Sequence, residues 1–408
     1  MGGVETFFIR LSRELLKRNI KSNFLFLYKK NTDQHLYDQL AFSSNIFFWS
    51  DISLNFSKSE KFNLFSPLKK NKINQIFKGV SAIHVDTSVT FFCAKRVISC
   101  LSADLQLMFG VYHANEISWG DNKQLPLYES YFRNKIFLDK ILFLFFNAFS
   151  SDVTKKRNSI DVLNEMIFPL GVDLPDFNGN KYIAQGTNKI KIVSVGRLVS
   201  FKAYNVYMLD VIRLLANQGV SVEYDVYGDG PLKESLVSYV AENNLSENIK
   251  YKGELEYSKL DKTLTDYDIF IGSGTALLHA AANGLPCIIA IENEQKPITY
   301  GFFSDLPGID YHEQNLPFER IEVSSLILKF IAMDELDRTK LKMAHNLKSK
   351  TFGIDGCADS FVTAIESAPL INGSRWQLYK FLFYFIFCEA FSKLFGGFRY
   401  SQKYDQKL

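Results

Sequence analysis

The 408-residue sequence is poor in cysteine. Its five cysteines are Cys93, Cys100, Cys287, Cys357 and Cys388, and no two of them form a CxxC pair. Structural zinc sites and disulfide frameworks are built from closely spaced cysteines, and a bridge framework is typical of much smaller secreted domains. The cysteine pattern therefore disfavours both kinds of site and favours a reducing compartment.

Long hydrophobic runs are also missing. A membrane-spanning helix needs about 18 or more consecutive apolar residues. The longest candidate here, FLFYFIFC at 381–388, is bounded by Lys380 and Glu389. The first residues, MGGVETFFIRLSRELLKRN, are amphipathic, whereas a signal peptide has a uniformly apolar centre. The sequence predicts a cytoplasmic protein that could touch the cytoplasmic face of a membrane peripherally.

Neither nucleic-acid binding nor a protein-held metal is indicated. The formal net charge is +3, so there is no basic excess of the kind that nucleic-acid-binding domains carry. The six histidines have no metal-ligand spacing, and they are His35, His84, His113, His279, His312 and His345. The DYD at 266–268 is better explained as a loop entering a strand than as a metal site. We expect no nucleic-acid partner, no metal and no other cofactor.

The chain does contain repeated alternation of strand and helix patterns. Residues 4–18 have apolar side chains at helical spacing. Four β-type runs follow before residue 113, at 22–28, 45–50, 81–85 and 105–112. After residue 189 the alternation is regular, with strands predicted at 190–196, 221–228, 248–253, 268–272 and 286–291 and helices between them. Such alternation is typical of α/β domains with mainly parallel sheets.

The boundaries between domains follow from changes in composition along the chain. We predict a first Rossmann-like domain over 1–173, a polar linker over 174–188, a second Rossmann-like domain over 189–350 and a helical region over 351–408.

Two cations follow the first strand of the second domain. Arg197 and Lys202 stand in the stretch SVGRLVSFKAYN, where the strand ends in a loop. Parallel sheets bind ligands at this kind of loop. A guanidinium and an ammonium suit a diphosphate, although two solvated surface cations would fit the placement equally well.

A glycine-rich turn favours the diphosphate interpretation. In IGSGTALLHAAANGLPCI (271–288), Gly272 and Gly274 allow a close approach of the backbone, and Thr275 begins a helix. Free N–H groups at a helix start can hold phosphate oxygens. The turn is not the GxGxxG pattern of a dinucleotide-binding fold, which counts against a dehydrogenase.

These pieces, in this order, resemble a known family. The segments are GGVE, FPLGVD, VGRLVSFKA, VYGDGP, IKYKGEL and TALLHAAANGLP, and they span about residues 2 to 290. The chain resembles retaining GT-B glycosyltransferases of the group 1 (family four) type. The resemblance implies two Rossmann-like domains facing across a cleft, with no metal held by the protein.

The resemblance also assigns roles to residues. It implies that Arg197 and Lys202 bind the donor diphosphate and take part in catalysis. It places Gly2 and Gly3 at the donor site, together with Gly274, Thr275 and Ala276. His113 is the candidate for contact with the transferred sugar, with Glu116 nearby, although a structural hydrogen-bonding role fits His113 as well.

One part of the family pattern is missing. Family members usually have two glutamates at the positions of Ile271 and His279. The second glutamate normally holds the ribose hydroxyls, and His279 could hydrogen-bond a ribose only as a neutral group. The sequence thus predicts transfer of a sugar from a nucleotide-sugar to a glycan or lipid-linked glycan in bacterial surface polysaccharide synthesis. A catalytically degenerate, nucleotide-binding partner of a polysaccharide assembly complex is the alternative.

The two ends of the chain carry further expectations. In the family a strand precedes the glycine loop, so we expect that the natural chain begins upstream of Met1. Residues 376–397 are rich in aromatic side chains, and the residues from Arg375 onward lean basic. This segment fits an interfacial membrane helix, a helix that docks on the domains, or both.

Overall fold

The computed structural model describes residues 3–29, 34–101, 104–113, 115–118, 126–136, 141–158, 162–175, 189–256, 259–371 and 375–395. The chain forms two compact units. Unit 1 consists of Met1–Gly171 and Ile354–Leu408, and unit 2 of Val172–Gly353. Most of the predicted linker lies outside the described residues.

Unit 2 is built on a five-stranded parallel sheet with the order β11-β10-β7-β8-β9. Its strands are β7 (Ile190–Val195), β8 (Val222–Tyr227), β9 (Ile249–Gly253), β10 (Ile269–Gly272) and β11 (Cys287–Ile289). A short antiparallel pair, β12 (Ile298–Thr299) and β13 (Ile321–Glu322), lies outside this sheet. All five strands predicted for this region are confirmed, with ends that differ by a few residues.

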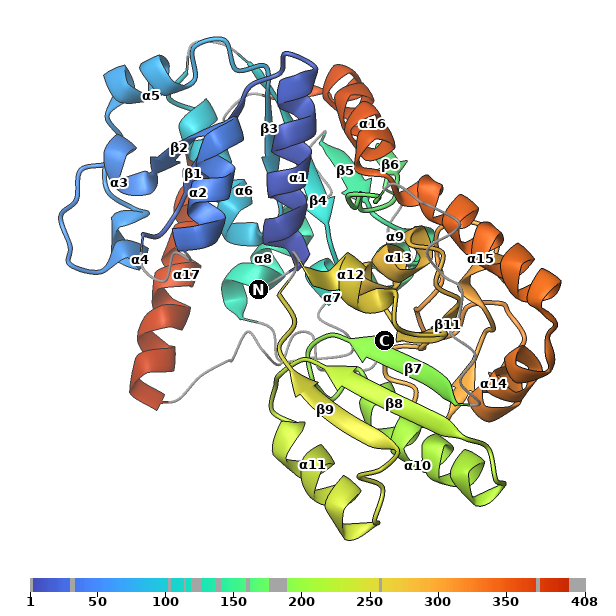
Figure 1. Cartoon of the computed structure of the whole chain (residues 1–408). Helices are drawn as coiled ribbons and strands as arrows, with labels where there is room; N and C mark the ends of the chain where they lie inside the picture. The colour runs from blue at the N-terminus through green and yellow to red at the C-terminus, as the bar shows by residue number, and fades with distance from the viewer. Residues whose placement is uncertain are drawn as a thin grey trace. The chain divides into compact units, whose positions relative to one another are not determined.

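Helices cover both faces of this sheet (Figure 1). They are α10 (Tyr204–Asn217), α11 (Lys233–Glu242), α12 (Leu260–Leu264), α13 (Thr275–Ala282), α14 (Val323–Ala332), α15 (Glu335–Ser349) and the 3-10 turns η3 (Phe303–Asp305) and η4 (Lys350–Phe352). Successive side chains of a strand point to opposite faces. Ile269 and Ile271 accordingly pack with α10, α11 and α14, whereas Phe270 packs with α12 and α13. A sheet buried on both faces explains the continuous apolar strands of the sequence.

A buried histidine ties α15 to the edge of this sheet. His345 is fully buried, and its Nε2 accepts a hydrogen bond of 2.9 Å from the backbone N–H of Cys287. Its Nδ1 lies 2.8 Å from the carbonyl oxygen of Leu341, so Nδ1 carries the proton. Burial lowers the pKa of His345 below its ordinary value, more than the hydrogen bonds to Leu341 and Cys287 raise it.

We expect the protein to lose stability in mild acid through His345. The unfolded chain binds a proton near pH 6.5, while the folded chain resists it. The free energy of unfolding should therefore be unaffected by His345 above that pH. Below that pH, protonation of His345 in the unfolded chain should lower the free energy of unfolding by about 1.4 kcal/mol per pH unit. This loss should end where the pH reaches the lowered pKa of His345 in the folded protein. Urea unfolding at pH 7.5, 6.5 and 5.5 measures this slope. His345→Gln should be less stable at pH 7.5 but show a shallower slope, and an equal slope in both proteins would contradict the assignment.

Unit 1 contains a second, mainly parallel sheet and a separate strand pair. Strands β3 (Ala82–Val85), β4 (Leu105–Val111), β5 (Leu142–Phe145) and β6 (Glu165–Ile167) run parallel. Strand β14 (Leu370–Ile371) joins β4 in the antiparallel direction, and β1 (Ser22–Phe26) pairs with β2 (Ser44–Phe48). Among the described residues, no strand pairing joins β1 to β3. The additional first strand stays a prediction.

The helices of unit 1 pack on both faces of its sheet and around the β1–β2 pair. They are α1 (Gly3–Lys17), α2 (Gln34–Ser43), α3 (Trp49–Ile52), α4 (Glu60–Asn63), α5 (Lys70–Ile76), α6 (Ser88–Ile98), α7 (Asn115–Ser118), α8 (Leu127–Ile136), α9 (Ala148–Asn158), α16 (Ile354–Ser367) and α17 (Arg375–Phe395). One core combines Leu107 and Phe109 of β4 with α6, α8 and α17. The opposite core combines Met108 with α1 and α16. The amphipathic helix predicted at 4–18 is confirmed as α1.

The last described helix, α17, packs on the N-terminal part of unit 1. Phe381 of α17 stacks on Phe92 of α6 with ring centroids 3.8 Å apart, and Phe385 contacts Tyr128 of α8 edge-on. Helix α17 therefore packs on the N-terminal domain, and the predicted docking of the C-terminal segment across both domains stays a prediction. No helix within the described ranges is both long and apolar enough to cross a lipid bilayer.

Candidate phosphate-binding site of unit 2

The loop after β7 packs unusually closely on the glycine turn after β8. The N–H of Gly196 donates to the carbonyl of Tyr227 at 2.9 Å, and the N–H of Leu198 donates to the carbonyl of Asp229 at 3.0 Å. Gly228 has a φ of 147°, and a Cβ atom there would lie 1.8 Å from the carbonyl oxygen of Gly196. Only glycine fits this position. The GDGP turn therefore has a structural role: it holds the β7–α10 loop in place.

Arg197 and Lys202 lie in this loop on either side of Leu198, whose side chain anchors the loop. Leu198 is fully buried, while Arg197 is exposed and Lys202 is half-buried. The Lys202 side chain folds back over the end of β7, because a Cβ atom at Gly196 would lie 2.8 Å from its Nζ. Among the residues that the structure describes, no carboxylate forms an ion pair with either cation. Both charges are therefore available to an anion.

The hydroxyl of Tyr204 lies beside the Lys202 ammonium. A Cβ atom at Gly196 would be 3.3 Å from this hydroxyl, and a Cβ atom at Gly272 would be 3.7 Å from it. Burial raises the pKa of Tyr204, and the positive charge of Lys202 opposes part of that rise. The neutral hydroxyl thus sits between the ends of β7 and β10, where it can donate a hydrogen bond to an anion held by Lys202.

This position is the switch point of the sheet. From β7 the chain adds β8 and β9 on one side, and it then returns to add β10 and β11 on the other. The loops after β7 and β10 consequently diverge and leave room for a ligand at their carboxyl ends. Arg197 and Lys202 thus follow β7 at the switch point, and their role in binding a ligand stays a prediction.

The loop after β10 brings the start of α13 to the same edge. Gly274 has a φ of 67° and precedes the first helical residue, and its carbonyl accepts a hydrogen bond of 3.2 Å from the Tyr311 hydroxyl. The N–H groups of Thr275 and Ala276 have no carbonyl to pair with inside the helix. They carry the partial positive charge of a helix N-terminus, which favours phosphate oxygens.

Sequence reasoning missed a polar cluster at the same edge. Glu292 follows β11, and its carboxylate accepts a hydrogen bond of 3.4 Å from Ser273 and lies 3.6 Å from Nε2 of His312. The carboxylate of Glu313 is buried and accepts the backbone N–H groups of Tyr311 and His312 at 3.0 and 3.1 Å. Glu292 stands directly after the predicted strand at 286–291, so the rule applied to Arg197 would also have selected it.

The two positions that depart from the family pattern are both buried. Ile271 is fully buried in the core below α10. His279 lies in the second turn of α13 with 4% of its surface exposed. Its predicted contact with a ribose stays a prediction.

Not all candidate residues of unit 1 lie within the described residues. Gly2 lies outside the described residues, and Gly3 is the first residue of α1. His113 is half-buried just after β4, and its carbonyl accepts the N–H of Glu116 at 2.8 Å. Glu116 is buried in the short helix α7. His113 thus stands at the carboxyl end of a central strand, and its role stays a prediction.

The DYD sequence has a structural explanation. The carboxylate of Asp268 accepts the backbone N–H of Lys191 at 2.9 Å, and its own N–H donates to the Lys191 carbonyl at 2.8 Å. These bonds fix the start of β10 next to β7. The predicted loop-to-strand role of DYD is confirmed.

Residues 181–293 match the family described as glycosyl transferases group 1. Over this segment the chain is similar to the group 1 glycosyltransferases. The matched segment includes both cations, the switch point, α13 and Glu292, whereas Tyr311, His312 and Glu313 follow it.

Two relatives show how far the sequence similarity extends. EpsF of Bacillus subtilis (strain 168) is 23% identical over 308 residues, which cover 71% of this chain and 76% of EpsF. The amylovoran biosynthesis glycosyltransferase AmsK of Erwinia amylovora is 30% identical over 111 residues, which cover 24% of this chain and 27% of AmsK. This chain thus aligns with only a part of AmsK, but with most of EpsF.

Solved structures extend the similarity to nearly the whole chain. HepE of Anabaena in complex with UDP has a TM-score of 0.61 at 12% identity, covering 90% of this chain and 96% of HepE. A glycosyltransferase from Rickettsia africae has a TM-score of 0.63 at 12% identity, covering 90% and 95%. Units 1 and 2 together have the GT-B fold, as the sequence predicted.

Proposed function

We propose that the protein transfers a sugar from a nucleotide-sugar to a glycan or lipid-linked glycan acceptor during the synthesis of a bacterial surface polysaccharide. The observation that carries this proposal is the pair of cations, Arg197 and Lys202, at the switch point of the unit 2 sheet. The Lys202 ammonium lies beside the Tyr204 hydroxyl, which in turn lies near Gly272, shortly before the start of α13. The relatives agree with it, since HepE binds UDP and AmsK is named for amylovoran biosynthesis.

The geometry suggests how the leaving group is stabilised. When the bond between the sugar and the diphosphate breaks, negative charge develops on the diphosphate oxygen. A lysine ammonium and a guanidinium, with helix N–H groups at the same edge, form charge-assisted hydrogen bonds to such oxygens. Preorganised donors of this kind lower the barrier, by several kcal/mol in well-studied enzymes. In this proposal Lys202 and Arg197 act on the leaving group, and His113 contacts the transferred sugar.

The setting is part of the same proposal. A lipid-linked acceptor would place the protein in the cytoplasm at the inner face of the membrane. No nucleic-acid partner is proposed.

Turnover of a labelled nucleotide-sugar tests the proposed function. Each nucleotide-sugar is offered with a cell-envelope glycan fraction, and released nucleoside diphosphate is measured together with label in the glycan. An active enzyme should produce both in equal amounts. A protein that binds a nucleoside diphosphate but releases none from any donor would instead be the degenerate partner described above.

We further propose that the reaction retains the anomeric configuration and uses no metal. Proton NMR of the product, recorded before mutarotation, should show the donor's anomeric configuration. The rate should also be unchanged in excess EDTA. An inverted product would overturn retention, and activity lost in EDTA but restored by Mn²⁺ would overturn the metal-free reaction.

A further inference from the structure

The outer side of α17 carries a line of exposed aromatic side chains. Tyr379, Phe383, Phe387 and Phe391 follow one another at intervals of four residues and are 64%, 65%, 51% and 51% exposed. The opposite side of the helix, which includes Phe381 and Phe385, is buried in the core of unit 1. An interval of four keeps side chains on one side of a helix. The helix is therefore apolar on both sides, and only one side is covered by the described residues.

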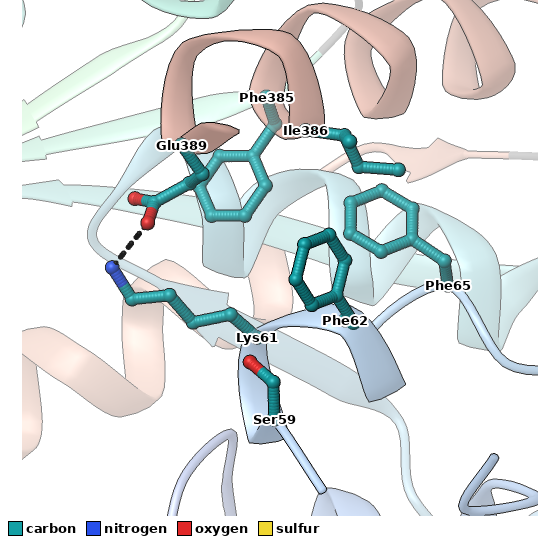
Figure 2. A pocket seen from close by; sticks show the side chains of 7 residues that line it. All are labelled: Ser59, Lys61, Phe62, Phe65, Phe385, Ile386 and Glu389. Carbon is teal, nitrogen blue, oxygen red and sulfur yellow. Dashed lines mark hydrogen bonds and ion pairs between the residues drawn. The ribbon is translucent and has the colours of Figure 1, made fainter. Parts of the chain in front are cut away.

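Helix α4 continues this surface. Figure 2 shows Phe62 and Phe65 facing Phe385 and Ile386 across a shallow hollow, with the Lys61 ammonium 2.6 Å from the Glu389 carboxylate. At about 100° per residue, Phe383 lies some 60° around α17 from Ile386, and Phe387 some 100°. The exposed aromatic line thus begins next to the contact with α4.

The loop before α4 adds two more exposed apolar side chains. Leu54 is 42% exposed and Phe56 is 74% exposed. The Asn63 side chain holds this loop against α4, because it accepts the N–H of Ser57 at 2.9 Å and donates to the Ser57 carbonyl at 2.7 Å. Phe56 is therefore held out on an anchored loop.

Lysines surround these apolar groups. Lys58 and Lys61 are exposed on the loop and on α4, Lys380 is exposed on α17, and Lys70 is exposed at the start of α5. The stretch 67–69 hydrogen-bonds directly to the loop, since Leu54 donates to the Pro67 carbonyl at 2.9 Å and Lys69 donates to the Ile52 carbonyl at 2.7 Å. The lysines are thus attached to the same local framework as Leu54 and Phe56.

We propose that this aromatic–basic surface docks on an anionic lipid bilayer. We define it by Leu54, Phe56, Phe62, Tyr379, Phe383, Phe387 and Phe391 with Lys58, Lys70 and Lys380; the charge of Lys61 is offset by its ion pair with Glu389. Aromatic rings partition into the boundary between headgroups and acyl chains. Lysine side chains near an anionic bilayer are attracted to its surface. A bilayer accepts both groups at once, and the proposal does not depend on glycosyl transfer.

The charge of the surface distinguishes a bilayer from a second copy of the chain. A copy would bring the same lysines together around the aromatic side chains, and like charges across an interface repel. An anionic bilayer would instead attract them. Beyond the last described residue, the sequence adds the cations Arg399, Lys403 and Lys407 against a single acidic residue, Asp405.

Co-sedimentation of the full chain with lipid vesicles tests the proposal. The wild-type protein should bind vesicles of phosphatidylglycerol and phosphatidylethanolamine, should bind pure phosphatidylcholine weakly, and should dissociate at high salt. Phe383→Ser/Phe387→Ser should lower the partition coefficient at least tenfold, because apolar area that enters the bilayer is lost. Lys58→Glu/Lys70→Glu should lower it by a similar factor and flatten the salt dependence.

Matched control variants distinguish binding through this surface from nonspecific binding and from the effects of misfolding. Met343→Ser/Leu347→Ser removes side chains of α15 that are 60% and 67% exposed in unit 2, and it should leave binding unchanged. Thermal melting checks the fold, and if the α17 variant melts early, Phe56→Ser on the loop replaces it. Absence of the wild-type protein from anionic vesicles, or equal binding by every variant, would overturn the proposal. So would a wild-type dimer that the α17 or Phe56 variant converts to a monomer, since the surface would then join two chains.

Discussion

Replacing Lys202 with alanine should weaken binding of a nucleoside diphosphate by about 10- to 100-fold. A hydrogen bond to a charged group contributes about 1.5–3 kcal/mol, and each 1.4 kcal/mol changes the dissociation constant tenfold. The Lys202 ammonium lies at the end of β7, beside the Tyr204 hydroxyl, and forms no ion pair with any described carboxylate. Isothermal titration with UDP, GDP and ADP identifies the nucleotide that binds best and then measures the loss.

Arg197→Ala should give a loss in the same range, because its guanidinium stands in the same loop. Lys340→Ala is the control, since Lys340 is an exposed lysine of unit 2 that pairs with Asp337 on α15. It should bind the nucleotide like the wild-type protein, and all three variants should melt like it. If Lys202→Ala and Arg197→Ala both retained full affinity, the assignment of the diphosphate site would be wrong.

Replacing Gly228 with alanine should lower the free energy of unfolding by about 2–6 kcal/mol. The new methyl group would meet the Gly196 carbonyl oxygen at 1.8 Å, and the φ of 147° is strained for any residue with a Cβ atom. Overpacking and backbone strain each cost about 1–3 kcal/mol. Since Gly196 lies under the Lys202 ammonium, protein that still folds should also bind the nucleotide more weakly.

Gly219→Ala isolates the strain from the clash. Gly219 has a φ of 80°, and a Cβ atom there would meet nothing within 4 Å. This variant should lose only about 1–2 kcal/mol, the cost of a left-handed conformation. Urea unfolding of both variants gives the comparison. Equal losses would mean that the contact between the β7 and β8 loops does not constrain the site.

Much of unit 2 could be predicted from its sequence, because its strands and helices have strong periodic patterns. The five strands are short apolar runs bounded by glycine or polar residues, and amphipathic helices separate them. Right-handed crossovers then leave few possible sheets. The position of Arg197 and Lys202 at the carboxyl end of a strand followed from this alternation alone.

The components of the site were harder to predict. Tyr204 looks like an ordinary apolar helix residue, and its hydroxyl reaches the site only because β7 and β10 are neighbours. Those strands lie far apart in the sequence. Glu292 and His312 come from separate loops, and their distance of 3.6 Å depends on how β11 and the later segments fold back. Likewise, the exposure of Phe383 and the burial of Phe385 became known only with the packing of α17 on unit 1.

The sequence by itself determined the α/β class, the order of strands and helices in unit 2 and the loop that carries the two cations, because these follow from local periodicity and short-range turn chemistry. Only the tertiary structure decided the strand order, the approach of Lys202, Tyr204 and Gly272 to one another, and which side of α17 stays exposed. Those features depend on contacts between segments far apart in the chain, and the pattern of any one segment leaves them undetermined.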